Sequence, residues 1–522
     1  MAVPKKGSLL ILIGLYVLTI PFFNALNVTA YDNSQILGHF GASTTVFAYS
    51  SYIPVFAMLA FIPLGLKIGK QIPIKTLILS ACFLSIFFNT ASLYCQNIFW
   101  FTLWRSLIAI VSVTGIFASL LPIVLKYNPT FNMAIMYGII QFIQKGSQQL
   151  YQYWGAKFIS FYDWTFGIYF LNVNFMVCIL LAWLFYKSDV IPMKEKFQFD
   201  WRGWFLMILF LLMVLILTVE GQSLNWWSDT RIGIVFASMV LLIGLYFIHV
   251  RYTELPILNP DVFKYKSVVF GSFLFFYTGI MNGTGSIVTG FMTRILGFDG
   301  LAVAQAHLPI LIGIIISVPL ATYLLFKRIY MSTIWIAGFA CYGLYHIILF
   351  FRFYPGIEAA DFFVPLMFKG LGMGFLYPAS ALYISEGVPK HLGDSRMLSG
   401  IFARVVFATL LGGAFLETIT SNTIALHKTG ISQQLNPTNE MANKTLTKDK
   451  KTFLYLGLSE TEAKKMAEKK LLNQTVVSAT LLAYKDIYLV MSAICFIPIF
   501  VILLFKLGRR PLGRVEVEPI PL

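Results

Sequence analysis

Polar side chains recur at helical spacing inside one apolar segment of this chain. Residues 132–156 are largely apolar, yet they contain Gln141, Lys145, Gln148 and Gln152. Intervals of three and four residues place such side chains on one face of an α-helix. A lysine and amides on one face could line a polar path for a solute, or they could join neighbouring helices by hydrogen bonds. We favour the path and keep the hydrogen-bonded seam as the alternative.

Three further basic residues lie inside apolar segments. They are Arg105, within "FTLWRSLIAI", Lys369 and Arg404. A charge in hydrocarbon is costly, so such residues usually face a cavity or a partner. Arg105 could instead extend its head group to a membrane surface, and Lys369 and Arg404 could brace neighbouring helices. We expect all three to line the same path as Lys145.

Acidic residues near the apolar segments are few. Glu417 and Asp32 lie close to segment ends. Removal from water favours the protonated form of a carboxylate, which is the property of a proton carrier. We therefore name both as candidate proton sites, the alternative being helix-end carboxylates in contact with solvent. His307 and His346 are expected to be hydrogen-bonded within the protein rather than to act as pH switches. The excess of basic over acidic groups favours a substrate with negative charge.

These residues must be positioned by helices that cross a membrane. Of 522 residues, 58% are hydrophobic and 12% are charged, whereas soluble proteins carry about 25% charged residues. A spanning helix needs about 20 apolar residues. Continuous apolar runs exclude the alternating pattern of barrel strands. The sequence therefore predicts an all-α membrane protein with about fourteen spans, at residues 8–29, 46–66, 74–94, 98–125, 132–156, 165–187, 203–219, 231–250, 268–291, 306–326, 330–351, 362–385, 399–420 and 485–507.

The distribution of basic residues predicts the orientation. Lys and Arg cluster in alternate connections, such as the one that holds Lys67, Lys70 and Lys75. Short basic connections stay in the cytoplasm. With an even number of spans, this pattern predicts cytoplasmic termini and a multi-pass protein of the cytoplasmic (inner) membrane. Because the basic residues lie at span ends, the net charge of +16 does not indicate nucleic-acid binding.

No pattern in the chain indicates an enzyme. The phosphate-binding pattern Gly-x-x-x-x-Gly-Lys-Ser/Thr is absent, and no cluster of Cys, His or Glu has the spacing of metal ligands. We expect no cofactor, no metal and no catalytic residue. The five cysteines fall in or beside apolar spans and are expected to be small buried side chains.

One long polar connection interrupts the pattern of spans. Residues 424–482 are rich in lysine and contain "SETEAKKMAEKKLLNQ". Ser459 and Glu462 have the spacing of a capping box, which predicts a helix that starts there. The favoured interpretation is a solvated helix on the outer side of the membrane. The alternative is that this connection docks a periplasmic partner.

Several segments, in order, resemble a known family. They are "FDWRGWFLMILFLLMVLILTVEGQSLNWWSDTRIG", "ELPILNPDVFK", "FKGLGMGFLYPAS", "SGIFARVVFATLLGGAFLETI" and "LLAYKDIYLVMS". Together they resemble the fourteen-span drug:proton antiporter branch of the major facilitator superfamily. In that branch an Asp-x-x-Gly opens the seventh span and a Glu-Gly followed by Trp closes it, which corresponds here to Asp200, Gly203, Glu220, Gly221 and Trp226.

The chain also departs from that branch at three places. The loop between spans two and three reads "PLGLKIGKQIPIK" and lacks the usual Asp. The Gly-Pro-rich motif of the fifth span is replaced by "QFIQKGSQQLYQYWG". Phe22 stands where the branch has an Asp in the first span. These differences bear on proton-driven drug antiport and not on the fold.

The resemblance implies a division of the chain into two bundles. Residues 1–187 would form a six-helix bundle, 188–266 would hold two inserted helices with their cytoplasmic connectors, and 267–507 would form a second six-helix bundle that includes loop 424–482. Residues 508–522 would be a cytoplasmic tail. Substrate would bind near the membrane midplane between the bundles, which would rock around it.

The implied function is secondary active transport by alternating access. The expected activity is proton-coupled export of hydrophobic or amphiphilic small molecules, with protons and the lipid bilayer as the other partners. A carrier of lipids or anionic metabolites without drug antiport is the first alternative. A non-transporting membrane receptor or scaffold is the second.

Overall fold

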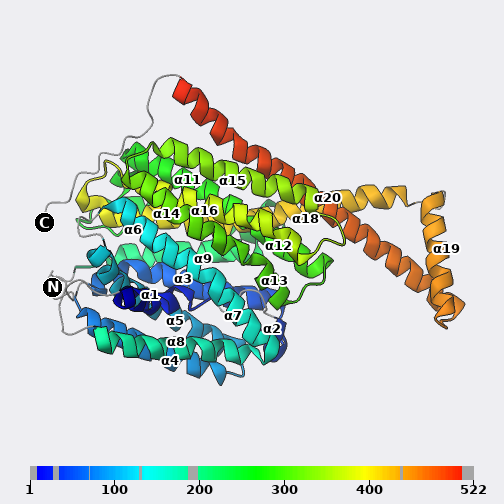
Figure 1. Ribbon diagram of the computed structural model, residues 1–522, viewed down its shortest axis with the longest axis horizontal. Helices are drawn as coiled ribbons and strands as arrows, with labels where there is room; N and C mark the ends of the chain where they lie inside the picture. The colour runs from blue at the N-terminus through cyan, green and yellow to red at the C-terminus, as the bar shows by residue number, and fades with distance from the viewer. Residues whose placement is uncertain are drawn as a thin grey trace.

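The computed structural model describes residues 9–27, 34–69, 71–127, 132–185, 198–435 and 439–507. Within these ranges the regular structure consists of helices and contains no strand. Figure 1 shows two groups of helices stacked on each other, the blue and cyan group below and the green and yellow group above. The predicted all-α membrane fold is confirmed.

The first bundle comprises the helices before residue 186. It is built from α1 (Leu9–Asn24), α2 (Ser34–Phe40), α3 (Thr44–Gly69), α4 (Ile74–Leu93), α5 (Ile98–Tyr127), α6 (Met133–Gln141), η1 (Phe142–Gly146), α7 (Ser147–Phe161) and α8 (Trp164–Phe185). The helix α5 packs against α1, α3 and α4, and α8 packs against α1, α4 and α7. Small and branched apolar side chains such as Ile78, Ala81 and Ile108 fill the space among these helices and are fully buried.

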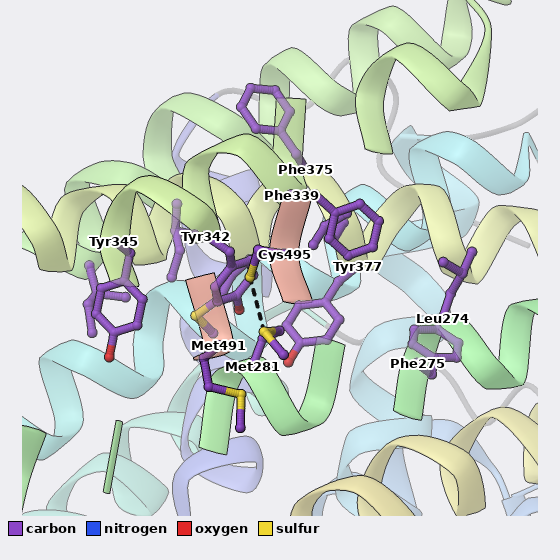
Figure 2. Packing of buried hydrophobic residues seen from close by; sticks show 14 of the residues in the cluster. Leu274, Phe275, Met281, Phe339, Tyr342, Tyr345, Phe375, Tyr377, Met491 and Cys495 are labelled. Atoms are coloured by element: carbon purple, nitrogen blue, oxygen red, sulfur yellow. Dashed lines mark hydrogen bonds between the residues drawn. The ribbon is translucent and has the colours of Figure 1, made fainter. Parts of the chain in front are cut away.

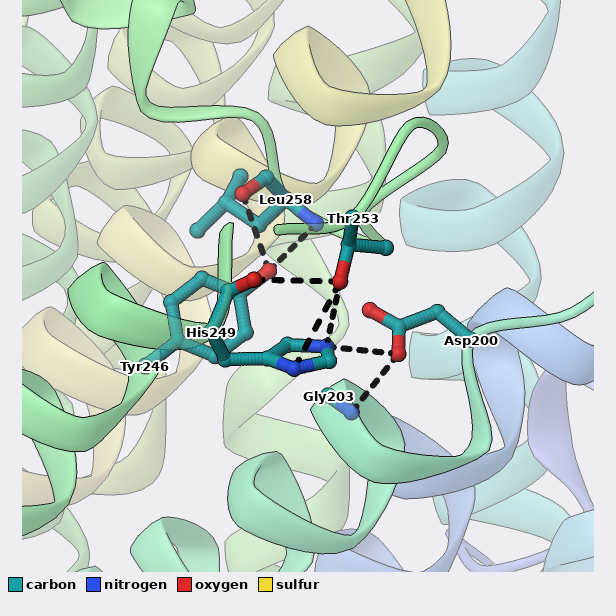
Figure 3. Close-up of polar contacts among 6 residues, drawn as sticks. All are labelled: Asp200, Gly203, Tyr246, His249, Thr253 and Leu258. Atoms are coloured by element: carbon teal, nitrogen blue, oxygen red, sulfur yellow. Dashed lines mark hydrogen bonds and ion pairs between the residues drawn. The ribbon is translucent and has the colours of Figure 1, made fainter. Parts of the chain in front are cut away.

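Two helices follow the first bundle, α9 (Trp201–Glu220) and α10 (Thr230–Val250). The carboxylate of Asp200 caps α9 by accepting a hydrogen bond from the Gly203 N–H at 2.8 Å. The same oxygen lies 2.8 Å from Nε2 of His249, near the end of α10 (Figure 3). The Tyr246 hydroxyl donates to the carbonyl of Leu258 and accepts from its N–H. These contacts join the two helices to the connector that leads into the second bundle.

The second bundle comprises the helices after residue 265. Its elements are α11 (Lys266–Gly283), α12 (Gly285–Gly290), η4 (Phe291–Ile295), α13 (Gly300–His307), α14 (Pro309–Phe326), α15 (Met331–Arg352), η5 (Ala359–Phe362), α16 (Phe363–Tyr383), η6 (Lys390–Leu392), α17 (Gly393–Ile401), η7 (Phe402–Leu411), α18 (Gly412–Gln434), α19 (Glu440–Tyr455) and α20 (Glu460–Leu507). Two short 3-10 turns, η2 (Trp226–Ser228) and η3 (Pro260–Lys264), precede it. Aromatic side chains and the Cys495–Met281 sulfur contact at 3.1 Å fill its core (Figure 2).

Glycines allow α14 and α16 to approach each other closely. A Cβ on Gly313 would lie 2.4 Å from the carbonyl oxygen of Met367, and one on Gly370 would lie 2.2 Å from that of Ile310. Membrane helices commonly associate through such small residues, because lipid offers no hydrophobic driving force between helices. The second bundle therefore depends on backbone contact at this pair.

Eleven of the described helices are long and apolar enough to cross a membrane. The other three predicted spans coincide with helical segments that fall short of that standard. These segments are α1, described over 16 residues, α6–η1–α7, which is polar and interrupted, and α11–α12, which is broken at Thr284. All fourteen predicted spans therefore correspond to helical segments of the structure.

The polar connection 424–482 is helical over its described part. The helix α18 extends to Gln434, α19 follows, and α20 runs without a break from Glu460 to Leu507 over 48 residues. The predicted last span, 485–507, is thus the second half of a longer helix. Figure 1 shows α19 packed on α20 at the far end of a projection that extends beyond the other helices of the second bundle. The predicted capping box is confirmed, since Glu462 Oε2 accepts from the Ser459 N–H at 3.1 Å and Ser459 Oγ lies 3.4 Å from the Glu462 nitrogen.

We expect Gly370→Ala to destabilise the second bundle. The added methyl group would collide with the carbonyl oxygen of Ile310, and overpacking of this kind costs about 1–3 kcal/mol. The Tm of the purified protein in detergent should fall by several degrees. Gly413→Ala is the matched control, because a Cβ there meets nothing within 4 Å. Equal Tm values for the two variants would contradict the close packing of α14 on α16.

Candidate functional site

The helix α6 of the first bundle lies directly against the second bundle. It packs against α14 and α16, and η1 packs against α14. A Cβ on Gly138 would lie 2.0 Å from Oγ1 of Thr322, so the backbone of α6 touches a side chain of α14. The Tyr137 hydroxyl lies 2.7 Å from Oγ of Ser385, which follows α16. The glutamine- and lysine-bearing segment identified in the sequence is therefore part of the interface between the bundles.

Two of the predicted path residues lie in π-helical turns. Lys145 lies in η1, and Arg404 lies in η7. The two turns occupy corresponding places, the fifth spanning segment of the first bundle and the fifth of the second. The carbonyl of Arg404 accepts a hydrogen bond from the Thr409 hydroxyl at 2.8 Å, five residues further along. The sequence predicted regular α-helices here. π-helical turns occur frequently at functional sites.

Lys369 lies on α16 and is 6% exposed. Its Nζ lies 5.6 Å from the ring centroid of Tyr345, on α15. A Cβ on Gly285 would lie 2.1 Å from this nitrogen, so any other residue at 285 would displace the ammonium group. The ammonium group is thus held between a tyrosine ring and a glycine backbone.

The helix α16 relates Lys145, Lys369 and Arg404 to one another. Lys369 lies on α16, Arg404 lies over a ring of α16, and α6, which continues into the π-helical turn of Lys145, packs against α16. The charges of Lys369 and Arg404 both act on Lys145, which belongs to the other bundle. Lys145 Nζ donates a hydrogen bond to Oε1 of Gln148 at 3.1 Å. The Arg404 guanidinium lies 5.7 Å from the ring centroid of Tyr377. Three of the basic residues that the sequence assigned to one path thus lie on or beside α16 and the segment of the first bundle that packs against it. We call them the basic triad.

The remaining glutamines of the predicted path lie on the same helical segment as Lys145. Gln141 and Gln152 are 5% and 7% exposed, and the side-chain oxygen of each lacks a hydrogen-bond partner among the described residues. A buried amide without partners is costly, and such groups in native proteins commonly bind water or a ligand. Gln152 keeps helical register with Gln148 on α7, whereas Gln141 precedes the π-helical turn.

Arg105 lies in a different environment from the triad. Its Nη2 donates a hydrogen bond to the carbonyl of Ala25 at 2.8 Å, and the residue is buried within the first bundle. Ala25 directly follows α1, so Arg105 satisfies a carbonyl at the end of that helix. Phe22, which stands where the resembling branch has an Asp, packs beside Phe175 with ring centroids 5.3 Å apart.

The structure describes one of the two candidate proton sites, Glu417. Glu417 is exposed on α18, and its charge acts on Tyr52 of α3 in the first bundle. Asp32 lies outside the described residues. Glu220, at the end of α9, accepts a hydrogen bond from the Tyr49 hydroxyl at 2.7 Å.

Sequence reasoning missed a buried hydrogen-bond network next to Lys369. Nδ1 of His346 lies 2.7 Å from the Tyr342 carbonyl, and its Nε2 lies 3.1 Å from Oγ1 of Thr284. The Tyr488 hydroxyl donates to the Thr284 carbonyl at 2.7 Å. His346 is thus hydrogen-bonded within the bundle, as predicted. The network joins Thr284, at the break between α11 and α12, to α15 and α20, and no sequence spacing relates residues so far apart in the chain.

The comparisons with known proteins agree with this fold. No family model matches the chain. The chain is 22% identical over 320 residues to the multidrug export protein EmrB of Escherichia coli K12, and the match covers 60% of each protein. It is 22% identical over 353 residues to the colistin resistance protein EmrB of Acinetobacter baumannii, covering 65% of this chain and 66% of that one. The chain thus spans 60% of the length of the Escherichia coli relative.

Solved structures of major facilitator transporters superpose on most of the chain. A POT family transporter in complex with a thioalcohol-conjugated peptide gives a TM-score of 0.57 at 14% identity and covers 97% of this chain and 99% of its own. A bacterial homologue of the lysosomal transporter Spinster gives 0.50 at 14% identity, with 97% and 99% covered. The nucleoside transporter NupG gives 0.51 at 10% identity, with 95% and 98% covered.

We expect Lys145→Glu to be at least as stable as the natural protein. A carboxylate at this position would replace repulsion from Lys369 and Arg404 by attraction. The Tm of the purified variant in detergent should exceed that of Lys145→Gln, which removes the charge without reversing it. A Tm for Lys145→Glu well below that of Lys145→Gln would mean that residue 145 does not face the other two basic groups.

Proposed function

We propose that this chain, which has the major facilitator fold and resembles the multidrug export branch of that superfamily, is a secondary active transporter of amphiphilic small molecules. The observation that carries the proposal is the basic triad. Its members come from both bundles and lie at their interface, where major facilitator transporters bind substrate. The EmrB relatives support a role in export.

The proposed mechanism is alternating access around the triad. Lys145 moves with the bundle of residues 1–187, and Lys369 and Arg404 move with the bundle of residues 267–507. In the empty protein, approach of the two bundles brings like charges together and is disfavoured. A substrate that neutralises these charges lowers the barrier to closure, and rocking then exposes it to the other side. Gln141, Gln148 and Gln152 supply hydrogen bonds along the same path.

Export would be driven by a proton gradient across the cytoplasmic membrane. In this proposal both termini are cytoplasmic, and the projecting helices α18–α20 lie on the outer side. Glu417 is the proton site that the described residues favour, because it lies on α18 and acts on Tyr52 of the other bundle. Asp32 is the second candidate. The α18–α20 projection is also the surface through which a periplasmic partner would dock.

A carrier of lipids or anionic metabolites is the second candidate function. The observation that favours it is the lack of an acidic partner for the triad among the described residues. Both candidates use the same interface and the same rocking motion. They differ in the substrate and in whether toxic compounds are exported.

We expect Lys145→Ala to abolish or re-specify transport while leaving the protein inserted. Growth of a host lacking its own efflux systems, expressing either form, would be measured against toxic amphiphiles of both charges. For the affected compounds, the minimal inhibitory concentration of cells that express Lys145→Ala should be at least tenfold below that of cells that express the natural protein. Lys157→Ala is the control, since Lys157 lies on the same helix over the Trp154 ring. If the variant protects against every compound as well as the natural protein does, Lys145 has only a structural role.

We expect Glu417→Gln to remove the pH dependence of transport. The amide mimics the protonated carboxylate, so the variant has no proton to exchange at this position. Efflux from everted vesicles would be followed from about pH 5.5 to about pH 8. Glu220→Gln, which keeps the oxygen that contacts Tyr49, serves as the control. If the pH profile of Glu417→Gln matches the natural one, the proton site lies elsewhere.

A further inference from the structure

The basic triad lacks acidic partners among the described residues. The ion pairs of the described chain all lie elsewhere, for example Arg352 with Asp361 and Lys470 with Asp449. Among the described residues, Lys145 has the neutral Gln148 as its hydrogen-bond partner, and Lys369 and Arg404 lie over tyrosine rings. Three like charges therefore share one interface without a counter-charge from this part of the protein.

The surroundings of the triad differ from those of a structural basic residue in the same fold. Arg105 is buried and donates a hydrogen bond to a backbone carbonyl, so its charged group has a polar partner within its own bundle. The triad residues have no such backbone partner among the described contacts. Two of them lie in π-helical turns, and the third lies against a glycine whose replacement would displace it. The charges of the triad are therefore not neutralised by an acidic residue or a backbone carbonyl among the described contacts.

The sign of the triad selects among substrates. A cationic substrate would be repelled by all three members, and a neutral one would leave the charges uncompensated when the bundles close. An anion would attract each of them and remove their mutual repulsion. Arginine and lysine are also the side chains that bind carboxylate and phosphate groups most often, arginine through paired N–H groups and lysine as a point charge.

The aromatic rings beside the triad indicate the rest of the substrate. Tyr345 and Tyr377 lie next to Lys369 and Arg404, and both are buried in the apolar core of the second bundle. Figure 2 shows both rings among Phe339, Tyr342 and other large apolar side chains. A charged group at the triad would thus have buried aromatic rings as neighbours on the side of the second bundle, and an apolar body is compatible with such surroundings.

We propose that the transported substrate is an organic anion, a carboxylate, sulfonate or phosphate ester with an apolar body, and that Lys145, Lys369 and Arg404 bind its charged group. This inference rests on the proposed function and adds the sign of the substrate to it. The three residues then bind the anion together. Neutralising any one of them therefore lowers the affinity for the anion and leaves the affinity for a neutral molecule of the same shape unchanged.

The test uses three probes with one ring system and different charges. They are 2-naphthalenesulfonate, 2-naphthylmethanol and (2-naphthylmethyl)ammonium. Binding to the full chain in phosphatidylcholine nanodiscs would be measured by equilibrium dialysis. The sulfonate should bind at least tenfold more tightly than the ammonium compound. The affinity for the sulfonate should fall at least tenfold in each of the variants Lys145→Gln, Lys369→Gln and Arg404→Gln, whereas the affinity for the alcohol should stay within twofold of the natural value. The control Lys157→Gln should change neither affinity.

Charge reversal keeps the test decisive where a neutralised variant folds poorly. Lys145→Glu should shift preference from the sulfonate toward the ammonium compound. Any of three results would overturn the proposal. The natural protein could bind the ammonium compound more tightly than the sulfonate, it could fail to bind the sulfonate, or all four triad variants could bind the sulfonate with unchanged affinity.

Adding phosphatidylglycerol to the nanodiscs identifies the source of the anion. Competition with the sulfonate assigns the site to a lipid head group, and lack of competition assigns it to a soluble molecule.

The failure of this inference is distinguishable from failure of the proposed function. If growth protection extends to cationic compounds only, transport stands and the anionic substrate is wrong. If the protein protects against no compound of either charge and moves none of the three probes across proteoliposomes, the proposed function itself is wrong.

Discussion

The cost of placing charge away from water governs this molecule. Within a membrane-spanning bundle, an ionised side chain must meet a partner, a cavity or the aqueous boundary. Arg105 meets the end of α1, and Arg352 meets Asp361. Lys145, Lys369 and Arg404 lie on or beside helices that pack at the interface between the two bundles, where Gln148 and two tyrosine rings are their neighbours. Relative movement of the bundles at this interface can change the surroundings of these three charges.

The apolar length of each segment made the spans predictable, because a bilayer demands about 20 apolar residues per helix. Interruptions within the spans were not predictable in this way. The turns η1 and η7 depend on which carbonyl each N–H reaches, and no residue type dictates that choice. The same limit applies to α20, where a polar half and an apolar half form one helix. Hydropathy separates those halves although the backbone hydrogen bonds continue through both.

The candidate site was predictable where burial cost alone decided the outcome. The sequence allowed Lys145, Lys369 and Arg404 to be grouped, because a lysine or arginine in an apolar span must face a polar partner, a cavity or the membrane boundary. Arg105 obeys the same rule but finds its partner in a backbone carbonyl, which sequence cannot reveal. The network around His346 was invisible for a related reason. Thr284, His346 and Tyr488 come from three distant parts of the chain, and only the packing of the helices brings them together.

The composition of the triad also constrains how transport could be coupled to protons. In a site lined by carboxylates, a proton and a cationic substrate compete for the same groups, and exchange follows directly. Basic groups attract an anion only while they carry their protons, so direct competition of that kind does not operate at the triad. Coupling to Glu417 would have to pass through the conformational equilibrium, as any coupling between separate sites does. Glu417 and Arg404 lie on one continuous helical segment with most of η7 between them. That segment is therefore the physical link through which occupancy of one site could bias the other.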